Sequence, residues 1–424
     1  MGIFSRLFGK RKVVKERETP KVTERQPVSV NTVSNNSDKN RLENTSTYVR
    51  KGGDVMKSEV IERVELTEYS EPYENLLLVP PNSNLSLSNI AGDIVINSWD
   101  QSLLKIIAIK HSWGENKRVA KEKVKQIEIK VNQQEDNVKI LTIFPEVEEG
   151  TKVEGYVSYR LFVPKEISLN IQTESGNTFI RDIYRNVAVK ATTGSILVRN
   201  ILGSVDATST VGNIEISNVR ENINVVATSG RVIANNISGN VDIETSSGEV
   251  RVSNIEQNVM VTTEQGNIII NNIQGNVDAK SSTGNVSIDT IASNVNVIVE
   301  YGNILLDNIQ GSITTRFNRG SLNIVNKHAP MIHASTTSGD INLNTVVHNG
   351  GKYLLETTIG TINMKIPSNS STAIIAKTIK GNISCELPLI ITRSGNEELA
   401  GILNQNKAII KLTTTEGDIN IRKK

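Results

Sequence analysis

The 424-residue sequence contains a single cysteine, Cys385, and aromatic residues make up only 4% of it. One cysteine cannot form an intrachain disulfide, so the stabilising framework of small secreted domains is excluded. No segment reaches the roughly 20 consecutive apolar residues that a membrane-spanning helix needs. Aromatic side chains are so scarce between residues 173 and 326 that this part of the chain offers almost no stacking surface for sugar rings or nucleic-acid bases. They are Phe179, Tyr184, Tyr301 and Phe317.

The sequence signatures of enzymes are also missing. The four histidines are scattered and form no HExxH motif or histidine–cysteine cluster. No GxxxxGKS/T loop and no calcium-binding repeat of the GGxGxD type occurs. Serine and threonine are plentiful, but none stands beside a base in a recognisable nucleophile motif. We therefore expect a non-enzymatic protein with no catalytic residue, no metal site and no cofactor.

What the chain does contain is a strict glycine repeat with a period of 18 residues. So short and regular a period is typical of a solenoid, in which each coil buries its apolar face by stacking on its neighbours. The repeat therefore predicts an all-β fold, a parallel β-solenoid (β-helix) with 18-residue coils. Parallel crossovers are almost always right-handed, which predicts a right-handed solenoid. The repeating glycines are Gly176, Gly194, Gly212, Gly230, Gly248, Gly266, Gly284, Gly302 and Gly320.

Apolar residues occupy fixed places within each coil. With the glycine counted as position 0, they fall at positions 2, 4, 7, 11 and 13. Alternation with a period of two is typical of strands, so we expect two strands of three to four residues in each coil. Asparagine, serine or threonine at positions 1, 6, 10 and 15 to 17 is expected at the corners, bonded to backbone. After Gly230, the apolar set is Val232, Ala234, Ile237, Val241 and Ile243.

Asparagine recurs in two columns, which we interpret as structural corner ladders in which like side chains bond along the stack. Position 6 holds Asn200, Asn218, Asn236, Asn254 and Asn272, and position 10 holds Asn222, Asn240, Asn258, Asn276 and Asn294.

A second repeat, of 36 residues, makes alternate coils different. It includes Asp206, Asp242 and Asp278, which lie at the outward position 12 without a basic neighbour at a fixed offset. We interpret them as a solvated face rather than as the carboxylate pair of a glycosidase. The same repeat places apolar residues at position 3, on the outside of the coil. They are Leu197, Ile233, Ile269 and Leu305.

This outward apolar set has two interpretations. Duplication of a two-coil unit would explain the rhythm by itself. Exposed apolar surface also usually marks a contact, so the set predicts binding of a protein partner or self-association.

The amino-terminal segment has a different character. Residues 1–25 hold eight Lys or Arg against three Glu, a net charge of +5, and the whole chain has +2, which leaves −3 for the rest. An apolar helical face followed by basic residues suits insertion beside anionic lipid. The candidate membrane-contact residues are Ile3, Phe4, Leu7, Phe8, Lys10, Arg11 and Lys12. A frayed start without this role is the alternative.

The same segment bears on localisation. Its apolar residues are interrupted by Arg6 and followed by charge, unlike a secretory signal. We therefore expect a cytoplasmic protein, peripheral to the inner face of the membrane, or alternatively one that reaches the cell surface by a non-classical route. Basic residues without interleaved aromatics favour membrane over nucleic acid, which we do not expect as a partner.

Composition and periodicity divide the chain into five parts. We expect an amphipathic basic segment at 1–12, a disordered linker at 13–57, an irregular β-rich capping region with one short helix at 58–172, regular coils at 173–326, and irregular C-terminal coils with a cap at 327–424. The helix is expected at Glu115–Val124. In the last part, TTTEGDINI (413–421) is expected to close the chain. The apolar run Ile402–Leu412 and the loop Ser394–Leu399 are expected to cover the last coil.

Three segments carry a resemblance to a known family. They are NIAGDIVINSWD (89–100), VSYRLFVPKEISLNIQTESGN (157–177) and the following array of coils. In this order they resemble the bacterial DUF4097 family, which also carries an adhesin label, over roughly residues 76 to 424. The resemblance implies a β-strand-repeat protein found near envelope-stress systems and brings no catalytic residues.

Together these features predict a scaffold or interaction protein of the bacterial cell envelope, associated peripherally with the membrane. The alternatives are a cell-surface adhesin, a self-assembling filament former similar to the bactofilins, and, with the least support, an enzyme that acts on polysaccharide.

Overall fold

The computed structural model describes residues 13–15, 60–62, 66–145, 155–395 and 397–424. Two compact units can be distinguished. The first comprises the described residues within 1–70, 112–126 and 145–154, and the second comprises 71–111, 127–144 and 155–424. The membrane-contact residues at 1–12, and most of the expected linker, lie outside the described residues.

The first unit contains the single helix of the described chain, α1 (Lys117–Lys125). Asn116 caps it, because its side-chain oxygen accepts a hydrogen bond from the Val119 amide at 3.1 Å. This confirms the helix expected at Glu115–Val124, although the helix begins two residues later than predicted. Two short strands, β1 (Val13–Lys15) and β2 (Val60–Glu62), pair antiparallel in the same unit.

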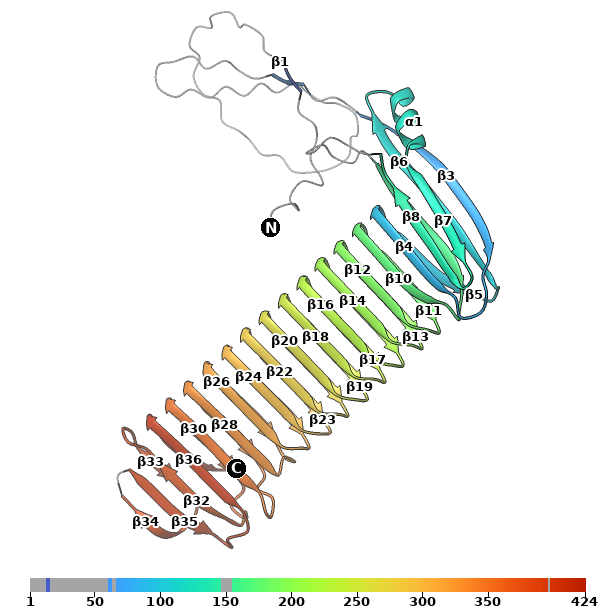
Figure 1. Cartoon of the computed structure of the whole chain (residues 1–424). Coiled ribbons are helices and arrows are strands. Elements are labelled where there is room, and N and C mark those ends of the chain that lie inside the picture. Colours follow the sequence, from blue (N-terminus) through green and yellow to red (C-terminus); the bar gives the residue numbers. More distant parts are fainter. Residues whose placement is uncertain (1–12, 16–59, 63–65, 146–154, 396) are drawn as a thin grey trace, which may run out of the picture. The chain divides into compact units, whose positions relative to one another are not determined.

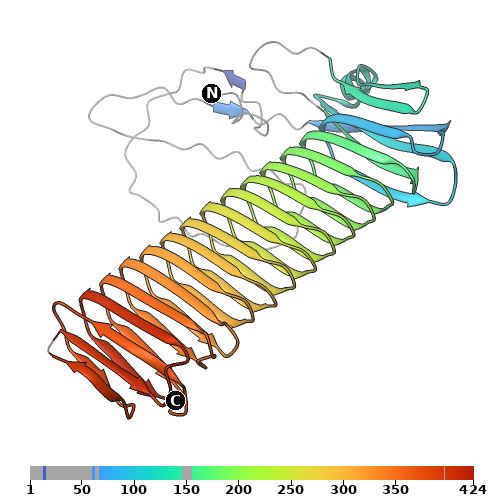
Figure 2. The ribbon, with the colours of Figure 1, turned by 60° about the horizontal axis from the view of Figure 1, so that its bottom comes forward.

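The second unit contains a two-sheet β-solenoid, whose coils follow one another as a ladder in Figures 1 and 2. Each regular coil gives one strand to sheet I and one to sheet II, and each strand pairs in parallel with its equivalent 18 residues away. Sheet I comprises β4 (Asn84–Ala91), β7 (Glu128–Gln134), β8 (Asn137–Ile143), β10 (Ser168–Ser175), β12 (Val187–Thr193), β14 (Val205–Val211), β16 (Ile223–Ser229), β18 (Val241–Ser247), β20 (Val259–Gln265), β22 (Val277–Thr283), β24 (Val295–Tyr301), β26 (Ile313–Arg319), β28 (Met331–Ser338), β30 (Lys352–Ile359), β32 (Thr372–Lys377), β34 (Ile390–Ser394), β35 (Glu398–Leu403) and β36 (Ile409–Glu416).

Sheet II forms the opposite wall of the solenoid. It comprises β3 (Thr67–Leu78), β5 (Ile94–Trp99), β6 (Leu103–Gly114), β9 (Gly155–Pro164), β11 (Thr178–Ile183), β13 (Ile196–Ile201), β15 (Ile214–Val219), β17 (Val232–Ile237), β19 (Val250–Ile255), β21 (Ile268–Ile273), β23 (Val286–Ile291), β25 (Ile304–Ile309), β27 (Leu322–Asn326), β29 (Ile341–Thr345), β31 (Ile362–Ile366), β33 (Ile383–Cys385) and β37 (Ile419–Lys423).

The core lies between the two sheets and follows the sequence pattern. All five predicted apolar positions of the Gly230 coil are buried, with exposed fractions of 0–1%. The strands are longer than the predicted three to four residues. They run for six residues in sheet II and seven in sheet I, because the constant 18-residue offset keeps neighbouring coils paired almost from corner to corner.

Position 15 also differs from the prediction. It was expected at a corner, but it is a sixth inward position, occupied by buried residues such as Ser209, Thr245 and Phe317. The hydroxyl of Thr245 donates to the Ser247 carbonyl at 3.2 Å, so a polar side chain at this position can be buried with a backbone partner.

The repeating glycine is required by its backbone conformation and by crowding. Gly248 has φ of +121°, and a Cβ placed there would lie 2.0 Å from the carbonyl oxygen of Gly230 in the preceding coil. The 36-residue repeat has a steric component as well. A Cβ at Gly239, position 9, would lie 2.4 Å from the carbonyl carbon of Glu221, so a coil with glycine there stacks on a coil with a larger residue.

Both asparagine ladders are confirmed. At position 6 each asparagine has φ near +57°, which turns the chain so that position 7 rather than position 6 faces inward. Its side-chain nitrogen donates to the asparagine one coil earlier, as from Asn254 to Asn236 at 3.0 Å. At position 10, Asn258 donates both its backbone and side-chain N–H to Asn240.

The coils at the amino-terminal end are stacked out of sequence order. β4 and β5 pair on one side with β10 and β11, and on the other with β8 and β9, although β8 and β9 come later in the chain than β4 and β5. β7 then pairs antiparallel with β8 and ends sheet I. The expected capping of this end is confirmed for sheet I, where an antiparallel strand closes the parallel ladder.

The carboxy-terminal end repeats this arrangement and corrects the predicted order. β36 and β37 do not close the stack; they lie between β30–β31 and β32–β33. The outer edge of β32 pairs antiparallel with β35, which pairs with β34. The sequence suggested otherwise because coils in a solenoid normally follow one another in chain order.

Candidate interaction surface

The four predicted partner-contact residues lie on the outer face of sheet II. Parallel register places position 3 of successive coils in a single line along the solenoid. Leu305 is 48% exposed, and the other three are half-buried by their neighbours in the sheet. We call this line the outer row. In order it consists of Phe179, Leu197, Glu215, Ile233, Arg251, Ile269, Ser287 and Leu305.

From Leu197 to Leu305, the apolar side chains of the outer row are separated by polar ones, whereas Phe179 and Leu197 are direct neighbours. Two of the separating residues are engaged in ion pairs with other rows. Glu215 accepts a hydrogen bond from Arg199 at position 5 of the preceding coil. Arg251 donates to Glu249, two residues earlier at the corner, at 2.6 and 3.3 Å. The third separating residue, Ser287, is small.

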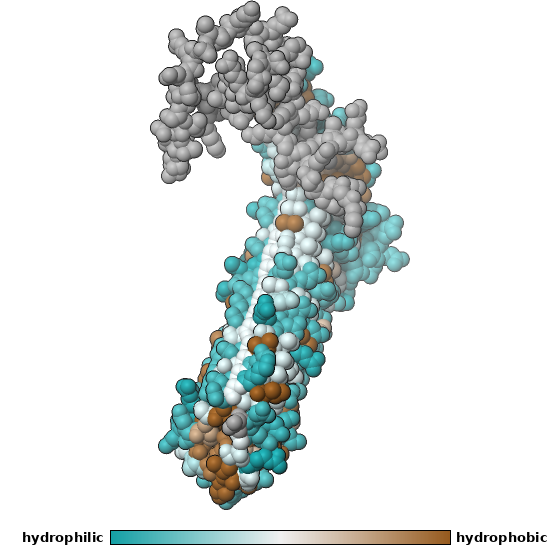
Figure 3. Space-filling model, turned by 90° about the vertical axis from the view of Figure 1, so that its left-hand side faces the viewer, coloured by the Kyte–Doolittle hydropathy of each residue, from teal (hydrophilic) through white to brown (hydrophobic). Residues whose placement is uncertain are grey.

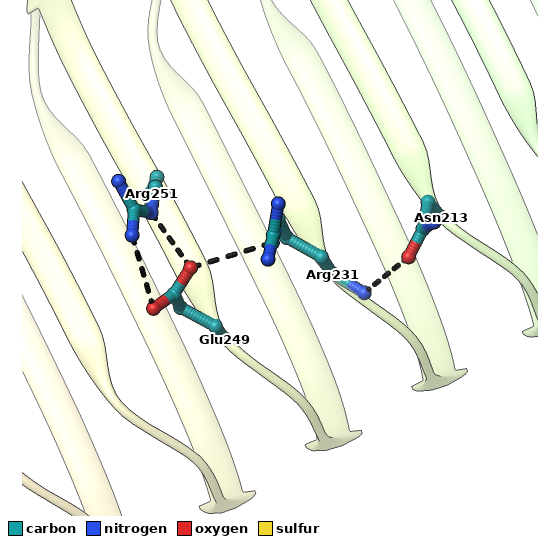
Figure 4. Close-up of polar contacts among 4 residues, drawn as sticks. All are labelled: Asn213, Arg231, Glu249 and Arg251. Atoms are coloured by element: carbon teal, nitrogen blue, oxygen red, sulfur yellow. Dashed lines mark hydrogen bonds and ion pairs between the residues drawn. The ribbon is translucent and has the colours of Figure 1, made fainter.

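Figure 4 shows the corner beside Arg251. Glu249 lies between two guanidinium groups, with Arg251 at 2.6 Å and Arg231 at 3.4 Å. The hydrogen bond from Arg251 is the main cause that lowers the pKa of Glu249. At most coils this corner holds Asn, Asp or Ser, and Asn213 still accepts from the Arg231 amide at 2.9 Å. Arg231 and Glu249 therefore replace a structural ladder residue with charge.

A shallow hollow of about 290 Å³ lies over the outer row around Ile233. Its lining includes Arg199, Glu215, Asn235 and Asn236 beside Ile233. An outward apolar side chain among polar groups suits contact with an apolar side chain of another molecule.

A second line of outward residues runs beside the outer row at position 5, and sequence reasoning did not identify it. Arg181 and Arg199 are aligned near its amino-terminal end. Asp289 and Asp307 lie directly opposite each other on β23 and β25 six coils further along. Like charges in direct register repel, yet neither carboxylate has a cationic partner among the described residues; both bond to Asn308.

Aromatic side chains lie at the amino-terminal end of sheet II. Trp99 and Phe162, outside residues 173–326, have rings 5.6 Å apart. In the neighbouring coil, Arg181 lies over Phe179 at 6.0 Å. Three adjacent strands at this end of sheet II therefore carry an aromatic residue.

The outer face of sheet I differs in character. Asp206 and Asp242 are exposed at position 12, as expected for a solvated face, and Asp278 accepts a hydrogen bond from Asn296 at 2.8 Å. A wide hollow of about 560 Å³ lies over Asp278, Asn294 and Thr314. Within the described residues, no three His, Cys, Asp or Glu side chains gather as metal ligands would.

Exposed apolar residues elsewhere are scattered. Figure 3 shows them on one side of the molecule as separate patches that gather toward the carboxy-terminal coils. Ile390 and Ile391 of the edge strand β34 are 67% and 58% exposed. A bulge between Ile391 and Arg393 interrupts this edge, which is a common way of blocking further strand addition. Among the described helical residues, none forms a helix long and apolar enough to cross a membrane.

Comparison with known proteins identifies the family. The profile of the Toastrack DUF4097 family matches residues 82–290 and 256–422, most of the chain. The chain belongs to this family, as its coil motifs predicted. No curated protein matches it.

Two solved structures are similar to it at low identity. One is described as a "putative cell adhesion protein" from Clostridium sporogenes ATCC 15579, with 12% identity, a TM-score of 0.22, and coverage of 84% of this chain and 100% of that one. The other is described as a "putative adhesin" from Bacteroides fragilis NCTC 9343, with 10% identity, a TM-score of 0.27, and coverage of 60% and 97%.

Proposed function

We propose that this protein is a non-enzymatic scaffold of the bacterial cell envelope that binds a protein partner through the outer face of sheet II. The observation that carries the proposal is the outer row, in which apolar side chains recur on alternate coils of a rigid two-sheet stack. Periodic apolar groups beside arginines are the composition of protein interfaces. Membership of the Toastrack DUF4097 family supports a repeat protein.

The test replaces Ile233 and Ile269 together by Lys. In bacteria that produce the full chain, chemical cross-linking should lose the adducts seen with the unchanged protein, because two buried cations would be left in the interface. The melting temperature should stay within a few degrees, since both side chains point outward. The control is Val226→Lys with Ile298→Lys on sheet I, where both side chains are exposed, at 41% and 37%. Adducts that survive the first pair of changes would refute the proposal.

Attachment to the inner face of the membrane is a separate part of the proposal. It is supported by the apolar face of Ile3, Phe4, Leu7 and Phe8, followed by Lys10, Arg11 and Lys12. Flotation with vesicles that contain anionic lipid should recover the full chain but not a chain lacking residues 1–12. Vesicles of neutral lipid are the control, and equal flotation of both chains would remove the membrane role. A link to envelope stress rests on the resemblance alone.

The alternative functions have distinct tests. Protease treatment of intact cells would degrade a surface adhesin and leave an internal scaffold intact. Filament growth by end-to-end stacking needs open parallel edges, whereas antiparallel strands end sheet I on both sides, so the geometry favours a scaffold over a bactofilin-like filament. Electron microscopy of the purified protein distinguishes these two.

A further inference from the structure

The position 5 line of sheet II has its charges separated by sign. Arg181 and Arg199 occupy two adjacent coils, and Asp289 and Asp307 occupy two others, with only uncharged residues between. The two arginines already contact polar groups, Asn97 at 2.7 Å for Arg181 and Glu215 for Arg199. The aspartates lack any cation among the described residues, so a cationic group from another molecule would relieve their mutual repulsion.

The spacing of these charges is symmetric. The midpoint between the coils of Arg199 and Asp289 is also the midpoint between the coils of Arg181 and Asp307, and it falls between β17 and β19. A two-fold axis through this point, parallel to the strands, would bring each arginine of one copy over an aspartate of another. The same axis would place Arg231 of one copy opposite Glu249 of the other. Such a self-complementary patch is the requirement for an isologous dimer.

We propose that the partner bound by the outer face of sheet II is a second copy of this chain, packed antiparallel and face to face, with Arg181 on Asp307 and Arg199 on Asp289. This inference rests on the proposed function and specifies its partner.

The outer row fits the same arrangement. The two-fold axis places three apolar residues of one copy opposite polar positions of the other, so that these side chains interleave. The pairs are Leu197 with Ser287, Ile233 with Arg251, and Ile269 with Glu215. At the ends of the row, Phe179 lies opposite Leu305, an apolar contact. Leu197 would lie over Ser287, between Ile269 and Leu305 of the second copy. The two larger polar residues of the outer row form ion pairs with residues outside it. Glu215 pairs with Arg199, and Arg251 pairs with Glu249, as Figure 4 shows. The 36-residue alternation thus serves the interface. A row with an apolar residue in every coil would leave no gaps for the side chains of the second copy.

The size of the face is adequate. Eight coils at about 4.8 Å span roughly 40 Å, and six-residue strands are roughly 20 Å long, which gives about 800 Å² per copy. This is the area that stable protein interfaces typically bury on each side.

The experiment is a charge exchange on the full chain, read by sedimentation velocity. One variant carries Arg181→Asp with Arg199→Asp, and the other carries Asp289→Arg with Asp307→Arg. Each alone places like charges at both ends of the interface and should dimerise at least ~10-fold more weakly than the unchanged protein. Mixed in equal amounts, they should form a heterodimer of nearly normal affinity, because opposite charges then meet at both ends.

The control is Asp206→Arg with Asp242→Arg on the outer face of sheet I, which should dimerise normally. Dimers that persist in either exchanged variant would overturn the inference, and so would a mixture that stays monomeric. A full chain that is monomeric at its highest soluble concentration would also overturn it. In that case, loss of cross-linked adducts on replacing Ile233 and Ile269 by Lys would still support the proposed function, with a different protein as partner.

Discussion

The position 6 asparagine combines a backbone role with a side-chain role. Asn254 has φ of +57°, a conformation that costs most residues about 1–2 kcal/mol and that asparagine and glycine tolerate best. Its side chain also accepts from Asn272 at 2.7 Å and donates to Asn236 at 3.0 Å. Asparagine combines both roles, which explains why it recurs at this corner, although Asp182 and Thr290 adopt a similar positive φ at the equivalent position of their coils.

Two substitutions at Asn254 separate these roles. Asn254→Gly removes the ladder bonds and keeps the conformation, whereas Asn254→Ala removes the bonds and strains the backbone. We expect the alanine variant to be the less stable of the two. The strain of alanine in this conformation, about 1–2 kcal/mol, exceeds the roughly 0.5–1 kcal/mol of extra backbone entropy that glycine loses on folding. Denaturant unfolding monitored by circular dichroism measures the difference. Equal stability of the two, or a less stable glycine variant, would contradict the strain argument.

At the residue level, the sequence predicts which side chains point into the core wherever apolar and polar residues alternate. The pattern of Val232, Ala234 and Ile237 could be read directly, because apolar side chains have no reason to recur at fixed spacing except burial. Ser209 and Thr263 at position 15 could not be read in this way. Their hydroxyls are typical of corners, and the residues at position 15 range in size from alanine to phenylalanine, so no single residue type marks this position as inward.

A hydrogen bond between two side chains connects the two sheets across the core. Tyr159 of β9 in sheet II reaches Thr142 of β8 in sheet I, with 2.7 Å between the two hydroxyl oxygens. Tyr159 is 2% exposed, and this burial raises the pKa of its hydroxyl. The side chains thus join the two walls of the solenoid at its amino-terminal coils.

This contact predicts a dependence on alkaline pH. Because the folded-state pKa lies above the unfolded value of about 10, the unfolded chain ionises first, and stability falls as the pH rises above about 10. Tyr159→Phe should be less stable at neutral pH by about 1–3 kcal/mol, since the Thr142 hydroxyl loses its partner. It should lose less stability than the unchanged protein between about pH 9 and about pH 11.

The matched control is Tyr301→Phe, an exposed tyrosine at 54%. Thermal unfolding of both variants across this pH range provides the comparison. A Tyr159→Phe chain with the same alkaline loss as the unchanged protein would refute the assignment.

At the level of elements, the candidate site was predictable in part. The 36-residue repeat identified Leu197, Ile233, Ile269 and Leu305, because a periodic apolar residue between two inward positions must point outward. Arg181 and Asp307 have no such signal. The charged residues of position 5 occur only at the two ends of its line, and the relation between these ends becomes visible only when the coils are aligned in space.

At the scale of the whole molecule, sheet I of the solenoid is closed at both ends by the same arrangement. At each end one coil is inserted between two others out of chain order, and an antiparallel strand covers the outermost coil in sheet I. No local pattern in TTTEGDINI could have indicated this placement, because its motif fits any slot in the stack equally well. Its position is defined by pairing with strands such as β31 and β33, which lie far from it in the sequence.

The single cysteine can report on this closure. Cys385 in β33 is half-buried beside Ile421 of β37, and burial raises its pKa, so it should react slowly with thiol reagents. Gly417→Ala would place a Cβ 2.1 Å from the carbonyl oxygen of Gly360 and should displace the inserted coil. We expect Cys385 labelling to accelerate by at least ~10-fold while amides in the coils at 173–326 stay protected from hydrogen exchange.

The control for this substitution is Gly395→Ala, where a Cβ would meet nothing within 4 Å. It should label as slowly as the unchanged protein. Unaltered labelling of the Gly417→Ala chain would show that the inserted coil does not govern access to Cys385.

The insertion of β36 and β37 also constrains the order in which the molecule can be built during translation. β32 and β33 are synthesised first, but their parallel partners in the finished stack emerge from the ribosome more than thirty residues later. Until then the coil formed by β30 and β31 has an unpaired edge in each sheet, which is paired only after β36 and β37 have been synthesised. Synthesis that stops before residue 409 would therefore yield an unfinished chain prone to capture by other strands, rather than a shorter working rod.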